Sequence, residues 1–205
     1  MVNYKISGIV TLGFLLVSWV LLTASFTTYT YKLGDSKEIE PQETVYLKFN
    51  KVKLEIDGKE QWENDITSGT KAQTALRASL AFAAMSWGLA TVSMILIVLN
   101  TIGLFSKVKA MSWILKLGPL FATVFCAVAL LVVLDMPDAL RKDCKNDNIY
   151  FIHTSPCADL FEKFKQDNGG WENGPSTTWY LLVVSTFFSL AGSIIGAIFG
   201  RYFRE

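Results

Sequence analysis

The sequence predicts an all-α membrane protein: a four-helix transmembrane bundle with a small α+β outer domain, made of a β-sheet and a short helix. Only 18% of the 205 residues are charged, whereas a soluble domain has about 25%. The charges are also segregated, since no charged residue occurs in 6–31, 78–106, 117–134 or 173–200. About 20 apolar residues cross a bilayer, or somewhat fewer when flanking lysines snorkel. Each of these stretches can therefore span the membrane.

These uncharged stretches set the boundaries of the predicted segments. We expect the transmembrane helices to lie within residues 1–31, 78–104, 113–134 and 178–200. The connecting segments are then a first outer loop at 32–77, a cytoplasmic turn at 105–112, a second outer loop at 135–177 and a tail at 201–205.

The first stretch also has features of a secretory signal peptide. Lys5 precedes an apolar run, and Thr23-Ala24-Ser25 offers a cleavage site. The apolar core of a signal peptide is about 7–15 residues long, and this run is longer. We therefore expect it to be retained as the first transmembrane helix.

The acidic residues predict the orientation in the membrane. Every Asp and Glu except Glu205 lies in 27–76 or 135–177. Short basic flanks stay in the cytoplasm. Here these flanks carry Lys5, Lys107, Lys109, Lys116, Arg201 and Arg204. We therefore expect both termini to be cytoplasmic and both acidic loops to be outside, in the plasma membrane or an endomembrane.

The first outer loop carries the strand signal. Apolar residues alternate with other residues at Val45, Leu47 and Phe49, and again at Val52, Leu54 and Ile56. The alternation slips by one at Asn50-Lys51, as a bulge or a tight turn requires. Asp57-Gly58 is a hairpin-turn dipeptide, so residues 59–64 can return as a third strand. The apolar face of such a sheet needs a cover.

The second outer loop predicts a short helix at 156–166 that can supply this cover. Ser155 can cap the helix, and Pro156 suits its first position. An apolar stripe follows at helical spacing. It consists of Cys157, Leu160, Phe161 and Phe164.

Two of the three cysteines, Cys144 and Cys157, lie in the second outer loop. Outside the cytoplasm they can form a disulfide with each other, which is worth roughly 3 kcal/mol for a loop of this size. Two free thiols or an intermolecular bridge are the alternatives. Cys126, in the third helix, is interpreted as a small apolar packing residue.

The sequence contains little that could carry chemistry. Ionisable side chains at membrane depth mark transport and catalysis, and the four apolar stretches contain none. The sole histidine, His153, has no ligand pattern around it, and phosphate loops, Cys-x-x-Cys pairs and nucleophile elbows do not occur. We therefore expect no enzyme activity, no metal, no cofactor and no nucleic-acid partner. We also find no polar stripe that would line a pore.

The fourth helix carries a stripe of small residues. Gly192, Gly196 and Gly200 recur every four residues, flanked by Ser189 and Ser193. Small residues at this spacing let helix backbones approach closely. The stripe can pack within the chain's own bundle, or it can form a contact between the protomers of a homo-oligomer.

In layout the chain resembles the four-pass claudin, peripheral-myelin-protein and epithelial-membrane-protein group. The shared features are cytoplasmic termini, a strand-rich first outer loop and a small outer helical region. The first loop holds one tryptophan, Trp62, and no cysteine, where claudins have a tryptophan-rich signature and a cysteine pair. No functional residue is therefore carried over. The resemblance implies a non-enzymatic protein that acts through lateral and trans contacts.

Two hypotheses of function follow. The first is a membrane-organising protein that self-associates in the lipid bilayer and uses its outer domain for adhesion or assembly, with protein partners in the same or an apposed membrane. The alternative is a channel-forming or channel-accessory subunit, because large-pore channels share the four passes and cytoplasmic termini. Ion conductance in reconstituted bilayers separates the two.

Overall fold

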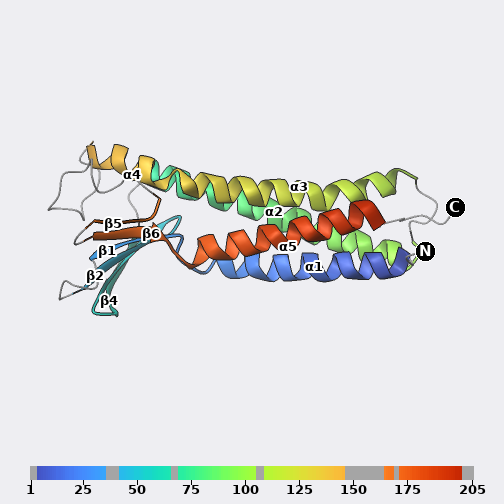
Figure 1. Ribbon diagram of the computed structural model, residues 1–205, viewed down its shortest axis with the longest axis horizontal. Helices are drawn as coiled ribbons and strands as arrows, with labels where there is room; N and C mark the ends of the chain where they lie inside the picture. Colours follow the sequence, from blue (N-terminus) through green and yellow to red (C-terminus); the bar gives the residue numbers. More distant parts are fainter. Residues whose placement is uncertain are drawn as a thin grey trace. The chain divides into compact units, whose positions relative to one another are not determined.

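The computed structural model describes residues 4–35, 42–65, 69–104, 109–145, 164–168 and 171–199. The chain divides into two compact units (Figure 1). The helix-bundle unit consists of Met1–Ala24, Phe82–Val128 and Leu181–Glu205, and the sheet unit consists of Ser25–Ala81 and Ala129–Tyr180. Both predicted outer loops therefore belong to a single unit.

Four long apolar helices account for most of the described chain. They are α1 (Tyr4–Ser25), α2 (Lys71–Thr101), α3 (Lys109–Leu134) and α5 (Thr177–Phe199). By length and composition, all four can cross a membrane. This number of candidate spans is the one that the charge-free stretches predict.

Interhelical hydrogen bonds define the neighbours within the helix-bundle unit. Trp19 of α1 bonds to Thr91 of α2, and Ser86 of α2 bonds to the α3 backbone. Thr123 of α3 bonds to Ser189 of α5, and Ser185 of α5 bonds back to α1. The helices therefore form a closed ring in the order α1, α2, α3, α5, in which each helix contacts two others.

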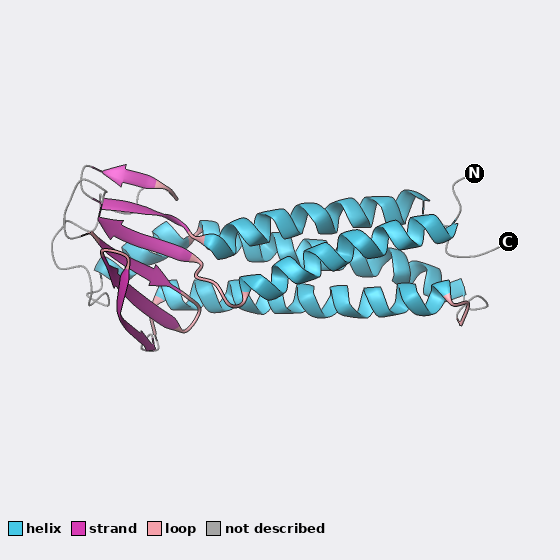
Figure 2. Cartoon of the chain, turned by 90° about the horizontal axis from the view of Figure 1, so that it is seen from below, coloured by secondary structure: helices cyan, strands magenta, loops and turns pink. Residues whose placement is uncertain are grey.

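The sheet unit holds an antiparallel sheet of six strands in the order β4-β3-β2-β1-β6-β5 (Figure 2). The strands are β1 (Tyr31–Asp35), β2 (Glu43–Leu47), β3 (Lys51–Ile56), β4 (Lys59–Asp65), β5 (Gln166–Asn168) and β6 (Trp171–Pro175). The predicted small antiparallel sheet is thus confirmed. Strands β1, β5 and β6 were not predicted, so both outer loops contribute to one sheet.

The turns of the sheet follow the sequence signals closely. Asp57 and Gly58 both have positive φ, at 51° and 72°, which is the conformation of a two-residue hairpin turn. The slip in alternation at Asn50-Lys51 is a tight turn, in which the Lys48 N–H donates to the Lys51 carbonyl at 2.8 Å. Phe49, predicted to lie in a strand, lies in this turn instead.

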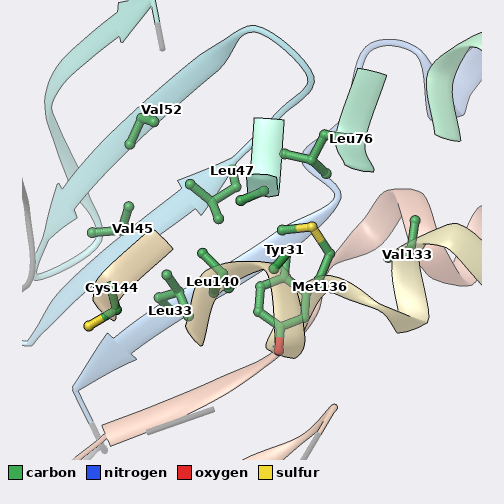
Figure 3. Packing of buried hydrophobic residues seen from close by; sticks show 12 residues of the cluster. Tyr31, Leu33, Val45, Leu47, Val52, Leu76, Val133, Met136, Leu140 and Cys144 are labelled. Carbon is green, nitrogen blue, oxygen red and sulfur yellow. The ribbon is translucent and has the colours of Figure 1, made fainter. Parts of the chain in front are cut away.

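One face of the sheet is apolar, and the helix α4 (Met136–Lys145) covers it. Figure 3 shows Met136 and Leu140 of α4 beside Tyr31 and Leu33 of β1. The core also contains Val45, Leu47, Val52, Ala72, Leu76, Val133, Ala139 and Cys144. Burial raises the pKa of the Tyr31 phenol, which donates to the Phe164 carbonyl at 3.0 Å.

The cover of the sheet therefore differs from the predicted one. The prediction placed a helix at 156–166, but residues 164–165 form a bend and Gln166 begins β5. Residues 156–163 lie outside the described part of the chain. Helix α4 was not predicted because its short apolar stripe lies among polar and charged residues. Phe164 packs against the sheet core, as expected.

Candidate functional site

The bundle helices carry hydroxyl side chains at seven-residue spacing, and these side chains are buried. The set is Thr11, Ser18 and Ser25 on α1; Ser79, Ser86 and Ser93 on α2; and Thr178 and Ser185 on α5. A repeat of seven residues keeps one stripe of a helix facing its neighbours. The expectation that no helix carries a polar stripe is therefore wrong. Averaged hydropathy conceals single hydroxyls, and only their spacing reveals them.

A reciprocal serine pair joins α1 to α5 at the centre of this core. The hydroxyl oxygens of Ser18 and Ser185 lie 2.8 Å apart. Each hydroxyl is also 3.1 Å from the other serine's backbone carbonyl. Both side chains are almost completely buried. Such close contact requires small residues at the crossing point.

A second hydroxyl cluster joins α3 to α5. Thr123 lies 2.7 Å from Ser189 and 3.0 Å from Ser193, measured between side-chain oxygens. The Thr186 hydroxyl donates to the Cys126 sulfur at 3.2 Å. Ser189 and Ser193 flank the glycine stripe, and the structure turns both inward, onto α3 of the same chain.

Helices α2 and α3 approach in the same way. The Ser79 hydroxyl donates to the Ala129 carbonyl at 2.9 Å, and Ser86 donates to Ala122 at 2.7 Å. Gly118 faces Ser93 so closely that a Cβ there would lie 2.5 Å from the Ser93 hydroxyl oxygen. Two of these hydroxyls therefore bind the α3 backbone at alanine positions, and the third lies against a glycine of α3.

The glycine stripe of α5 contacts α1 at its first member. A Cβ on Gly192 would lie 3.1 Å from the Phe14 Cβ and 3.6 Å from the Thr11 carbonyl oxygen. Gly196 is also buried, and Gly200 lies outside the described residues. The geometry at Gly192 favours the first alternative from the sequence, namely packing within the chain.

Two tryptophans join α1 to α2 through hydrogen bonds and ring stacking. The Trp19 indole N–H donates to the Thr91 hydroxyl at 2.9 Å, and the Trp87 indole N–H donates to the Thr23 hydroxyl at 3.0 Å. The rings stack with their centroids 5.6 Å apart. Each indole thus bonds to the helix that carries the other indole.

A buried carboxylate caps the start of α2 in the sheet unit. Asp143 of α4 is 1% exposed, and its two oxygens accept the backbone N–H groups of Lys71 and Ala72, each at 2.7 Å. Thr70 accepts the next N–H, from Gln73, at 3.1 Å. A helix leaves its first N–H groups without intrahelical partners, and here three of them are satisfied. This capping explains why α2 begins before residue 78.

The other face of the sheet is polar and crossed by ion pairs. Lys32 of β1 binds Glu172 of β6 at 3.3 Å, and Lys53 of β3 binds Glu55 and Glu60 at 2.7 and 3.1 Å. Hydrogen bonds to Glu55 and then Glu60 raise the pKa of the Lys53 ammonium. We call this surface the polar sheet face.

A shallow hollow of about 160 Å³ lies on the polar sheet face. Gly34 lines it, and a Cβ there would lie 2.8 Å from the Glu43 carbonyl oxygen, so only glycine fits. The other lining residues are Lys32, Gln42, Thr44, Tyr46, Glu55, Gly58 and Glu172. This site can offer hydrogen bonds and paired charges to a polar partner.

The remaining predicted site residues are placed as follows. Val45 and Leu47 lie in β2, and Val52, Leu54 and Ile56 lie in β3. Cys144 is buried on α4, and Cys157 lies outside the described residues, so their disulfide stays a prediction. Within the described ranges, three or more His, Cys, Asp or Glu side chains nowhere gather as a metal site would require.

The disulfide predicts a specific labelling pattern. A membrane-impermeant pegylating thiol reagent added to intact cells should modify neither Cys144 nor Cys157 until a reductant is supplied, because a disulfide sulfur is not a nucleophilic thiolate. The measurement is a gel-mobility shift, with Cys144→Ser as the control that frees Cys157. A covalent dimer on a non-reducing gel would indicate an intermolecular bridge instead.

Comparison with known protein families finds no matching family model, and no curated protein matches the chain.

Proposed function

We propose that this chain is a non-enzymatic four-pass membrane protein that self-associates and organises the membrane through its sheet unit. Both termini are cytoplasmic and the sheet unit lies outside, in the plasma membrane or an endomembrane. This orientation rests on the basic flanks at 105–112 and 201–205, set against the acidic segments that build the sheet.

The orientation predicts the accessibility of inserted tags. An epitope placed between Asp57 and Gly58 should be stained by antibody on intact cells, or on sealed right-side-out vesicles if the protein is intracellular. An epitope after Ser106 should be stained only after permeabilisation. The hairpin is a suitable outer position because both residues are exposed. External staining at Ser106 would overturn the orientation.

One observation carries the proposed mode of action: polar groups are distributed unequally between the two units. The helix hydroxyls described above bond mainly within the chain, and the residues left exposed on the helices are largely apolar, as lipid contact requires. The polar sheet face instead presents tyrosines and ordered ion pairs. Tyr29 and Tyr46 lie 5.6 Å apart between ring centroids, and Lys53 lies 5.7 Å from the Tyr29 ring. Tyrosine-rich surfaces of this kind are common at protein interfaces.

The proposal is tested by the number of copies per lipid disc. A variant with Lys32→Glu and Lys51→Glu inverts two charges that are 36% and 42% exposed, so folding should tolerate it because surface ion pairs contribute little stability. We expect fewer copies per disc at an unchanged Tm. Lys142→Glu with Lys145→Glu, on exposed positions of α4, is the matched control and should keep the copy number.

A channel-forming or channel-accessory subunit is the second candidate, and the buried hydroxyl stripes favour it. Hydroxyl-lined helix faces can become water-lined if the helices separate. Planar-bilayer recording discriminates the two functions. Single-channel conductance from purified protein would establish the channel. Its absence from the planar bilayer, for protein that forms discs with several copies, would favour the organising role.

A further inference from the structure

Two buried hydroxyls of α1, one of them in the stripe defined above, differ from the other helix hydroxyls. Ser7 and Thr11 of α1 are 3% and 0% exposed. Neither side-chain oxygen has a hydrogen-bond partner in the part of the chain that the structure describes. Buried polar groups are nearly always hydrogen-bonded, and an unpaired one is costly.

The other helix hydroxyls show which hydrogen bond is absent at Ser7 and Thr11. A threonine in a helix can satisfy its hydroxyl on the carbonyl four residues earlier. Within these helices that bond is made by Thr23, Thr91, Thr101, Thr123 and Thr186. The Thr11 hydroxyl makes no such bond, and the Ser7 hydroxyl likewise has no partner among the described residues.

The backbone of Thr11 lies against α5 at a glycine. Gly192 of α5 lies beside the Thr11 carbonyl and contributes no side chain, and Gly196 follows one turn later. Leu15, one turn along α1, packs with Ile97 and Leu115 in a buried apolar cluster. The Thr11 backbone therefore lies beside a glycine of α5, one helical turn from this apolar layer.

We propose that Ser7 and Thr11 bind water within the bundle. Residues four apart on a helix face have Cβ atoms about 5–6 Å apart, and one water with two hydrogen bonds of about 2.8 Å spans that distance. A neutral ligand fits because the apolar run of α1 after Lys5 and the whole of α5 contain no ionisable residue except Tyr180. The apolar layer of Leu15, Ile97 and Leu115 separates this water from the Ser18–Ser185 pair.

The test is radiolytic footprinting of the full chain in lipid discs with oxygen-18 water, because radicals formed from a bound water oxidise adjacent side chains. We expect oxygen-18 on Phe14 or Leu15, at a dose that leaves lipid-facing Phe187 unlabelled. The Ser7→Ala, Thr11→Val double variant should reduce this label at least about fivefold. Thr101→Val, which removes a back-bonded hydroxyl, should leave it unchanged.

Thermal unfolding supplies the second readout. If one water joins both hydroxyls, either single variant lowers Tm, and the double variant lowers it no further than the larger single effect. Two results would overturn the proposal: no label on Phe14 or Leu15 in the wild type, or an increase in Tm on Thr11→Val. Such an increase would mean that the hydroxyl was buried without any partner.

Discussion

Replacement of Gly192 by leucine is expected to lower the free energy of unfolding of the single chain by about 3 kcal/mol, the upper part of the range for overpacking. Even the first added carbon would lie 3.1 Å from the Phe14 Cβ, and leucine adds three more. Phe14 has little room to move, because its ring packs on Phe188 with the centroids 5.9 Å apart. Thermal or denaturant unfolding in lipid discs measures the loss.

Ala197→Leu is the matched control for this variant. It enlarges a small residue on the same helix, but at an exposed position, so the stability of the chain should change little. If Gly192→Leu left stability intact and instead dissociated an oligomer, the glycine stripe would lie between protomers. The packing described for α1 and α5 would then be incorrect.

Replacement of Asp143 by alanine is expected to cost about 3 kcal/mol of unfolding free energy. The change removes two hydrogen bonds to a charged group and leaves the Lys71 and Ala72 N–H groups without their acceptor. Hydrogen bonds to charged groups contribute about 1.5–3 kcal/mol each. The carboxylate is also stabilised by the positive, N-terminal end of the α2 dipole. Asp143→Asn, which keeps one acceptor, should lose less.

Asp138 provides the comparison on the same helix. Its side chain is 47% exposed and pairs with Arg141 one turn away, and an exposed pair of this kind contributes about 0.5 kcal/mol or less. Asp138→Ala should therefore leave the unfolding midpoint nearly unchanged in the same assay. Equal losses for the two aspartates would show that Asp143 is not the cap of α2.

The four membrane-length helices and the hairpin turns could be predicted from sequence because their signals are local. Charge-free stretches of bilayer length identify the four spans, and Asp57-Gly58 has the turn chemistry that its positive φ values require. Strands β1 and β6 lack such a signal. Gly34 in β1 and Gly174 in β6 interrupt any alternation of apolar and polar residues. Each of these strands forms because neighbouring strands on both sides supply its backbone hydrogen bonds.

The buried polar contacts could not be predicted by the same means. Asp143 and Lys71 are far apart in the chain, and only the folded sheet unit brings α4 to the start of α2. The hydroxyl stripes were accessible in principle, since Ser79, Ser86 and Ser93 recur every seven residues. A search for runs of polar residues misses them, because mostly apolar residues lie between the serines.

The copy number of the wild-type protein in native lipid tests the proposed self-association most directly. Protein extracted from its membrane into lipid discs, without detergent, can be counted by single-molecule photobleaching of one fluorophore per chain. Self-association predicts discs that hold two or more copies, and the same distribution after dilution and return to lipid. A population of single copies at every protein-to-lipid ratio would contradict it.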